Sequence, residues 1–258
     1  MLLLFRVILA SAALILVAIV SANGQTQRAE IETIVKDYLA KHPEEIERVV
    51  KQYLITDPDV LKDALSELRQ RVVRHTEKSS IVRANAEQLL NSSHQVTLGN
   101  PKGDVTIVEF FDYNCGFCKR ALSDMISLLK DDLNLRVVLK EFPILGPGSL
   151  EAARIAVAVR MQDPDGQKYL AFHQKLLGGR GHADASLATS AAQDSGVDME
   201  RLARDVTSEE VRNTLDENMK LARALGITGT PSYVIGDAVV PGAVGLVALE
   251  EAIRAARN

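Results

Sequence analysis

The stretch from Val105 to Cys118 constrains this sequence more than any other. An apolar, β-prone run, Val105–Phe111, leads directly into Cys115 and Cys118, which are separated by two residues. A segment with helical periodicity follows at once, so Cys115 is expected at a helix N-terminus. Free backbone N–H groups and the helix dipole favour a thiolate there and lower a cysteine pKa from about 8.5 to roughly 3.5–7.5. The pattern predicts Cys115 as a nucleophile and Cys118 as the thiol that resolves a mixed disulfide.

A cysteine pair with this spacing is also half of a zinc or iron–sulfur site, so metal binding is the competing interpretation. The chain has only 2 cysteines, and its 5 histidines are scattered without ligand spacing. A purely structural disulfide is disfavoured, because so short a loop removes little entropy from the unfolded state. We therefore predict thiol chemistry with no cofactor and no metal site.

Three segments carry a family resemblance: Glu109–Lys119 (EFFDYNCGFCK), Lys140–Gly146 (KEFPILG) and Gly229–Gly236 (GTPSYVIG). Together they resemble the DsbA-like thiol–disulfide oxidoreductases, which have a thioredoxin fold. The match runs in order from about Val96 to the C-terminus. Within that family, the chain is most similar to the branch with an N-terminal helical extension, to which the suppressor-of-copper-sensitivity protein C belongs.

The resemblance implies roles for residues around the cysteine pair. Glu109 matches the family's buried acidic residue, whose raised pKa would let it relay a proton to or from the resolving thiol. An edge-strand glutamate facing water is the alternative. Pro231 matches the family's cis-proline, beside which the backbone of Thr230 can pair with an extended substrate strand. Gly116 and Phe117, between the cysteines, are expected to contact substrate as well.

The N-terminus predicts export. Leu2–Val20 is an almost unbroken apolar run with one positive charge, Arg6, and Val20-Ser21-Ala22 has the small-residue pattern of a signal-peptidase site. No cluster of positive charges follows, so we predict a cleaved secretory signal over residues 1–24, with an uncleaved anchor as the alternative. Export to an oxidising compartment, the periplasm, suits a working cysteine pair.

Residues 25–93 are predicted to form a helical arm. Tyr38-Leu39 and Pro43 recur fifteen residues later as Tyr53-Leu54 and Pro58, which predicts short helices joined at proline corners. We expect self-association through the coiled-coil seam of a third helix, with a hinge in its polar stretch at residues 74–80. Packing of this helix on the chain's own catalytic domain is the alternative. The seam residues follow alternating four- and three-residue steps: Leu61, Leu65, Leu68, Val72, His75, Ser79, Val82, Ala86 and Leu89.

Residues 94–258 are predicted to form the catalytic domain. A helical block over about 147–225 interrupts it, where a plain thioredoxin fold has one helix, so the block is an inserted helical subdomain, as the resemblance implies. His173 and His182 in this block are interpreted as packing or surface residues. The predicted fold class is α/β: a thioredoxin-like domain with a helical insertion, preceded by an α-helical arm. The main strands are expected at Val96–Leu98, Val105–Phe111, Leu135–Lys140 and Ser232–Ile235.

These features predict an exported protein disulfide isomerase or reductase acting on periplasmic proteins with cysteines. A homo-oligomer, with a trimer suggested by resemblance, would favour isomerisation, since several active sites raise the effective thiol concentration around a misfolded client. A membrane thiol–disulfide partner is expected to recharge the pair. The alternatives are a DsbA-type dithiol oxidase, a periplasmic copper or zinc binder, and an idle interaction module. The net charge of −4, without a basic stripe, argues against nucleic acid.

Overall fold

The computed structural model describes residues 30–257, so the predicted signal peptide over residues 1–24 lies outside the described residues. The side chains of Arg71, Arg74 and His75 lie outside them as well. The chain divides into two compact units between Gln70 and Arg71. Within the described range, no helix combines the length and the apolar character needed to span a membrane.

Helices make up the described part of the first unit. One helix covers residues 30–41, α2 spans Pro43–Thr56, and α3, which spans Pro58–Ala84, begins in this unit. Pro43 and Pro58 each open a helix, where the N–H that proline lacks has no intrahelical partner to lose. The predicted proline corners are therefore confirmed.

A mixed five-stranded sheet forms the centre of the second unit, with strand order β1-β3-β2-β4-β5. Strand β2 is parallel to β3 and antiparallel to β4, which places Glu109 between Leu139 and Tyr233 in neighbouring strands. β2 is an inner strand covered on both faces, and apart from Thr106 and Glu109 its residues are apolar. The strands are β1 (Val96–Gly99), β2 (Val105–Phe111), β3 (Leu135–Glu141), β4 (Ser232–Ile235) and β5 (Ala238–Pro241).

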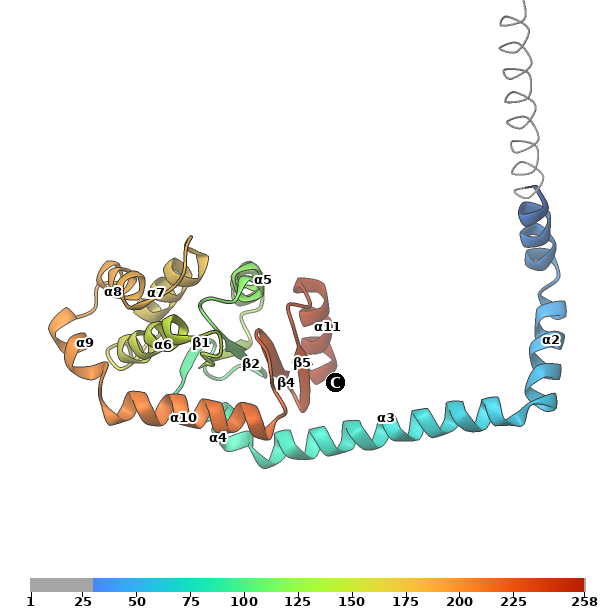
Figure 1. Ribbon diagram of the computed structural model, residues 1–258, viewed down its shortest axis with the longest axis horizontal. Coiled ribbons are helices and arrows are strands. Elements are labelled where there is room, and N and C mark those ends of the chain that lie inside the picture. The colour runs from blue at the N-terminus through green and yellow to red at the C-terminus, as the bar shows by residue number, and fades with distance from the viewer. Residues whose placement is uncertain (1–29, 258) are drawn as a thin grey trace, which may run out of the picture. The chain divides into compact units, whose positions relative to one another are not determined.

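Helices cover both faces of this sheet (Figure 1). Successive residues of a strand point to opposite faces, and they contribute to two apolar clusters. The first cluster joins the face of Ile107 and Phe111 to α5 and α11. The second joins the face of Val108 and Phe110 to α4, α10 and the end of α3. These helices span Ala86–Leu90 (α4), Gly116–Asp131 (α5), Glu209–Ala224 (α10) and Leu246–Arg257 (α11).

The predicted helical insertion between β3 and β4 is confirmed. Its helices are separated by short loops, and α6 at its centre contacts α7, α8, α9 and α10. Together with the sheet and the preceding helices, the insertion confirms the predicted thioredoxin-like α/β fold class. The insertion comprises α6 (Pro147–Arg160), α7 (Gln167–Gly178), α8 (Ala185–Asp194), α9 (Met199–Asp205) and α10.

The residues of the predicted coiled-coil seam are exposed at its N-terminal end and buried at its C-terminal end. Leu61, Leu65 and Leu68 are 49%, 46% and 57% exposed, whereas Val82 and Leu89 are 4% and 1% exposed, within the second apolar cluster. The alternative interpretation, packing on the chain's own domain, is therefore right for the C-terminal end of the seam. Helical periodicity defines an apolar face but does not say which surface covers it. Helix α3 runs without a break through residues 74–80, where the hinge stays a prediction.

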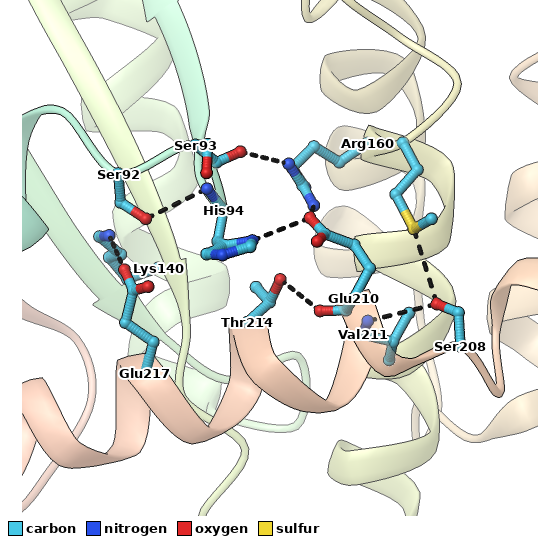
Figure 2. Close-up of polar contacts among 11 residues, drawn as sticks. Ser92, Ser93, His94, Lys140, Arg160, Ser208, Glu210, Val211, Thr214 and Glu217 are labelled. Atoms are coloured by element: carbon cyan, nitrogen blue, oxygen red, sulfur yellow. Dashed lines mark hydrogen bonds and ion pairs between the residues drawn. The ribbon is translucent and has the colours of Figure 1, made fainter.

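Polar contacts fix the segment that follows α4 (Figure 2). Arg160 donates to the Ser93 carbonyl at 2.8 Å and also pairs with Glu210. His94 Nδ1 lies 2.9 Å from the same Glu210 carboxylate. Two side chains of the insertion therefore hold the chain just before β1.

Lys140 of β3 makes a second attachment from inside the core. Its side chain is fully buried, and its ammonium donates to the Gln88 carbonyl of α4 at 2.7 Å. The same ammonium lies 3.7 Å from the Glu217 carboxylate of α10 (Figure 2). Burial lowers the pKa of Lys140 to about 8, against the opposing effect of Glu217. Helix α4 is thus tied to both the sheet and α10.

Candidate active site

Cys115 occupies the N-cap of α5, directly after the inner strand β2. Its sulfur accepts a hydrogen bond from the backbone N–H of Cys118 at 3.4 Å. The N-terminus of a helix supplies such N–H donors together with the positive end of the dipole, and both stabilise a thiolate. Both cysteines are free thiols, and Cys115 keeps 5% exposure while Cys118 has 0%. The local geometry therefore suits Cys115 to attack an incoming disulfide.

Cys118 lies one helical turn further into the protein. Burial raises its pKa strongly, with smaller contributions from Cys115 and Glu109, while the Asp112 backbone N–H acts in the opposite direction. A thiol with so high a pKa stays protonated at neutral pH. Cys118 therefore needs a proton acceptor before its sulfur can attack.

Glu109 is buried on β2, with 4% exposure. The alternative of a water-facing glutamate on an edge strand is wrong, because β2 lies between β3 and β4. Burial raises the pKa of Glu109 from 4.5 to about 8, and Asp124 adds to the shift. A carboxyl that titrates near neutral pH can both accept and return a proton.

The loop before β4 approaches Cys115 from another side. The Thr230–Pro231 peptide bond is cis, and the Cys115 thiol donates to the Thr230 carbonyl at 3.2 Å. Both residues also line a groove of about 240 Å³. Between the cysteines, Gly116 and Phe117 are exposed, and the Arg120 guanidinium lies 4.3 Å from the centre of the Phe117 ring. Thr230, Gly116 and Phe117 therefore lie next to the cysteine pair in space or in the chain.

A buried carboxylate that the sequence analysis missed braces the chain just before Cys115. Asp112, 1% exposed, accepts hydrogen bonds from the backbone N–H groups of Asn114, Ile144 and Leu145 at 2.8, 2.8 and 3.0 Å. It also accepts from the Ser149 hydroxyl at 2.7 Å. An Asp that accepts from the backbone N–H two residues on is a local turn feature, but the bonds of Asp112 to residues 144–149 are not local.

Asn114 and Lys119 extend this brace to the helical insertion. The Asn114 amide donates to the Ala183 carbonyl at 2.9 Å and accepts from the Ala183 N–H at 2.7 Å. Lys119 donates to the carbonyls of Gly179 and Gly181 at 3.1 and 3.2 Å. The loop of residues 179–183 is therefore bound on both sides of the cysteine pair.

A second buried acid, Glu141, lies at the end of β3. Tyr169 and Tyr113 donate hydrogen bonds to it, the latter at 3.4 Å, yet burial raises its pKa to about 8. His173 lies 3.3 Å from the Tyr113 hydroxyl, and burial lowers its pKa to about 3. His173 is thus a packing residue, while His182 is exposed.

Metal ligation has no further support from the described side chains. Across residues 30–257, no group of three or more His, Cys, Asp or Glu side chains is placed to hold a metal ion. A metal bound to Cys115 and Cys118 would need ligands from another molecule to complete a four-coordinate site.

A cysteine at the start of the helix after an inner strand, a protonated cysteine one turn later and a cis-proline loop beside them define a thiol–disulfide oxidoreductase on a thioredoxin-like fold. The family model of the DSBA-like thioredoxin domain matches residues 106–254. The chain belongs to this family.

Three known proteins show the extent of the similarity. A thioredoxin-like oxidoreductase from Silicibacter pomeroyi DSS-3 is 46% identical, with a TM-score of 0.63 over 66% of this chain and 96% of that chain. Proteus mirabilis ScsC in a transitional conformation is 26% identical, with a TM-score of 0.63 over 83% of this chain and 94% of that chain. Disulfide bond formation protein D of Bacillus subtilis is 26% identical over 156 residues, 57% of this chain and 69% of its own length.

Proposed function

We propose that this protein is an exported disulfide isomerase or reductase acting on periplasmic proteins that contain cysteines. The observation that carries the proposal is the apolar face that the first unit leaves uncovered, in a chain whose second unit is a thiol–disulfide oxidoreductase. Leu61, Leu65 and Leu68 of this face are each at least 46% exposed. Export is supported by the signal-like pattern of residues 1–24.

The exchange begins at Cys115. Its thiolate attacks one sulfur of a client disulfide, which forms a mixed disulfide and releases the other client sulfur as a thiolate. In reduction, Cys118 then attacks the Cys115 sulfur, the reduced client leaves, and a Cys115–Cys118 disulfide remains. A membrane thiol–disulfide partner returns that disulfide to two thiols. In isomerisation, a client thiolate attacks the mixed disulfide instead, so Cys115 is released and a new client disulfide remains.

Three further groups support these steps. Glu109, with its pKa near 8, takes the proton that Cys118 must lose before it attacks, and it returns that proton when the thiol is regenerated. The backbone beside Thr230 and Pro231 pairs with the client segment as an extended strand. Gly116 and the exposed ring of Phe117 contact the same segment from the start of α5.

The arm of residues 25–93 supplies oligomerisation in this proposal. Exposed apolar faces of this kind mark association surfaces, and its short helices are marginal without a partner surface. An oligomer, which resemblance suggests is a trimer, would place several Cys115 thiolates around one client. The effective thiol concentration then exceeds that of one isolated site, which favours repeated exchange.

Deletion of the residues before Arg71 tests this proposal. The cut is placed there because it keeps the buried residues Val82 and Leu89, which a cut at Asn91 would remove. The mature protein is expected to be an oligomer by light scattering and to reactivate scrambled ribonuclease. The truncated form is expected to be a monomer that still reduces a synthetic peptide disulfide but no longer isomerises. A monomeric mature protein, or a truncated form that isomerises as well as the parent, would contradict the proposal.

A dithiol oxidase is the second candidate, favoured by the name of the B. subtilis relative, disulfide bond formation protein D. The redox state of Cys115 and Cys118 in cells separates the two. Acid quenching followed by thiol alkylation should find the isomerase at least partly reduced, whereas an oxidase would be held as the disulfide.

A further inference from the structure

The loop of residues 179–183 lies at the active site without belonging to the exchange chemistry. Lys119, one turn after Cys115, holds the carbonyls of Gly179 and Gly181 at 3.1 and 3.2 Å. Asn114, directly before Cys115, makes a two-way pair with the Ala183 backbone at 2.9 and 2.7 Å. The loop is therefore fixed to both flanks of the nucleophile by four hydrogen bonds.

Two side chains of this loop remain on its surface. Arg180, between the two anchored glycines, and His182 are both exposed. A Cβ built on Gly148 would come within 2.6 Å of His182 Nε2, so the absence of a side chain at Gly148 gives the imidazole its place against the first turn of α6. The loop thus carries an exposed arginine and an exposed histidine on a backbone that is bonded to residues on both flanks of Cys115.

The carboxylates that neighbour the loop are engaged elsewhere. Asp112 is buried and accepts four hydrogen bonds. Asp184 caps α8 by accepting from the Leu187 N–H at 2.9 Å, and Glu151 accepts from the Ala185 N–H at 3.2 Å. These two carboxylates compensate the positive end of α8, and within residues 30–257 neither of them forms an ion pair with Arg180.

We propose that loop 179–183 is a specificity element, in which Arg180 selects clients that carry an acidic residue close to the reacting cysteine. This inference rests on the proposed function, since it names the substrate class of the same site. A client strand held at Thr230 presents its cysteine to Cys115, and residues beside that cysteine then pass the rim of the site. A carboxylate there gains Coulomb attraction to the guanidinium, while an ammonium is repelled.

The test uses two synthetic peptides, each with one intramolecular disulfide, that differ only in Glu or Gln beside the cysteine that is attacked. The mature reduced protein is expected to react about two- to fivefold faster with the Glu peptide at low salt, the range that an exposed ion pair supports. The preference should shrink as salt rises, because the screening length is only about 10 Å at 0.1 M. Arg180→Glu should reverse the preference, so that the Gln peptide reacts faster than the Glu peptide.

Arg204→Glu is the matched control, since it makes the same charge change at an exposed position of α9 and should leave the preference as it is. Equal rates for the two peptides with the parent protein would overturn the inference while the proposed exchange activity stands. The inference would also be overturned if Arg180→Glu slowed the reactions of both peptides by the same factor, because that would indicate a structural role for Arg180. If neither peptide reacts, the proposed function is overturned as well.

Discussion

The two compact units contain similar apolar residues but bury them to different degrees. In the first unit, Ile34, Val49 and Leu68 are 66%, 61% and 57% exposed, whereas in the second Val108 and Phe110 are both 0% exposed. The second unit therefore has its own hydrophobic core. The apolar side chains of the first unit form a face that remains exposed. A helix of this kind gains most of its stability from the surface that covers its apolar side. The proposed function therefore predicts that the first unit depends on association and that the second does not.

The largest expected effect concerns chemistry that belongs to the second unit alone. Cys115→Ser should abolish exchange in both the full and truncated forms without changing light scattering. Cys118→Ala should instead accumulate mixed disulfides at Cys115, because the resolving step is lost. Thiol alkylation of proteins from the native compartment, followed by non-reducing gels, measures the loss of exchange in the first variant and the adducts in the second. Recovering no adducts with Cys118→Ala would favour the metal-binding or idle alternatives.

Two leucines of one seam sharpen the contrast between the units. Leu89→Ala should lower the free energy of unfolding of the second unit by about 2–5 kcal/mol, since Leu89 is fully buried and truncation leaves a cavity. Leu65→Ala, at an exposed position, should change it by no more than about 0.5 kcal/mol but weaken association. Denaturant unfolding and light scattering separate the outcomes. Equal destabilisation by both variants would show that the two ends of the seam share one environment.

The pH dependence of stability tests the buried acids of the second unit. The pKa values of Glu109 and Glu141 are raised by burial from 4.5 to about 8, so the folded state keeps protons that the unfolded state releases. Stability should therefore fall as pH rises from about 4.5 to about 8, by at most about 1.4 kcal/mol per pH unit for each group.

Glu109→Gln and Glu141→Gln should each flatten this pH profile. Only Glu109→Gln should also slow the attack of Cys118, so Glu141→Gln is the matched control for the proton-transfer role. Thermal unfolding across this pH range and stopped-flow exchange measure the two effects. A profile that keeps its slope in both variants would assign the pH dependence to other groups.

The smallest expected effects come from surface ion pairs. Arg257 of α11 reaches Asp104 and Asp132, each at 2.8 Å, and so joins three segments of the second unit. Arg48 pairs only with Glu45 on its own exposed helix. We expect Arg257→Gln to lower the melting temperature slightly and Arg48→Gln to leave it unchanged within error, since exposed pairs contribute little. A larger loss for Arg48→Gln would indicate that its ion pair is buried by association.

Local order was predictable from local sequence. Pro43 and Pro58 at helix starts and Cys115 at a helix N-cap follow from rules that involve a few neighbouring residues. The resemblance also anticipated the cis bond before Pro231, where the residues alone favoured a trans bond. The burial of Glu109 was expected both from the resemblance and from the alternation of the strand. The anchoring of the active-site loop was not anticipated, because Asn114 and Ala183 are 69 positions apart.

By itself, the sequence determined the elements, the cysteine pair and the presence of an apolar face on the arm, since periodicity and capping are properties of short segments. Only the tertiary structure decided what each face contacts. It covered Val82 and Leu89 but left Leu65 exposed, although one pattern contains all three. It also raised the pKa values of Glu109 and Glu141, because the cost of burying a charge depends on everything packed around it and not on the neighbours in the chain.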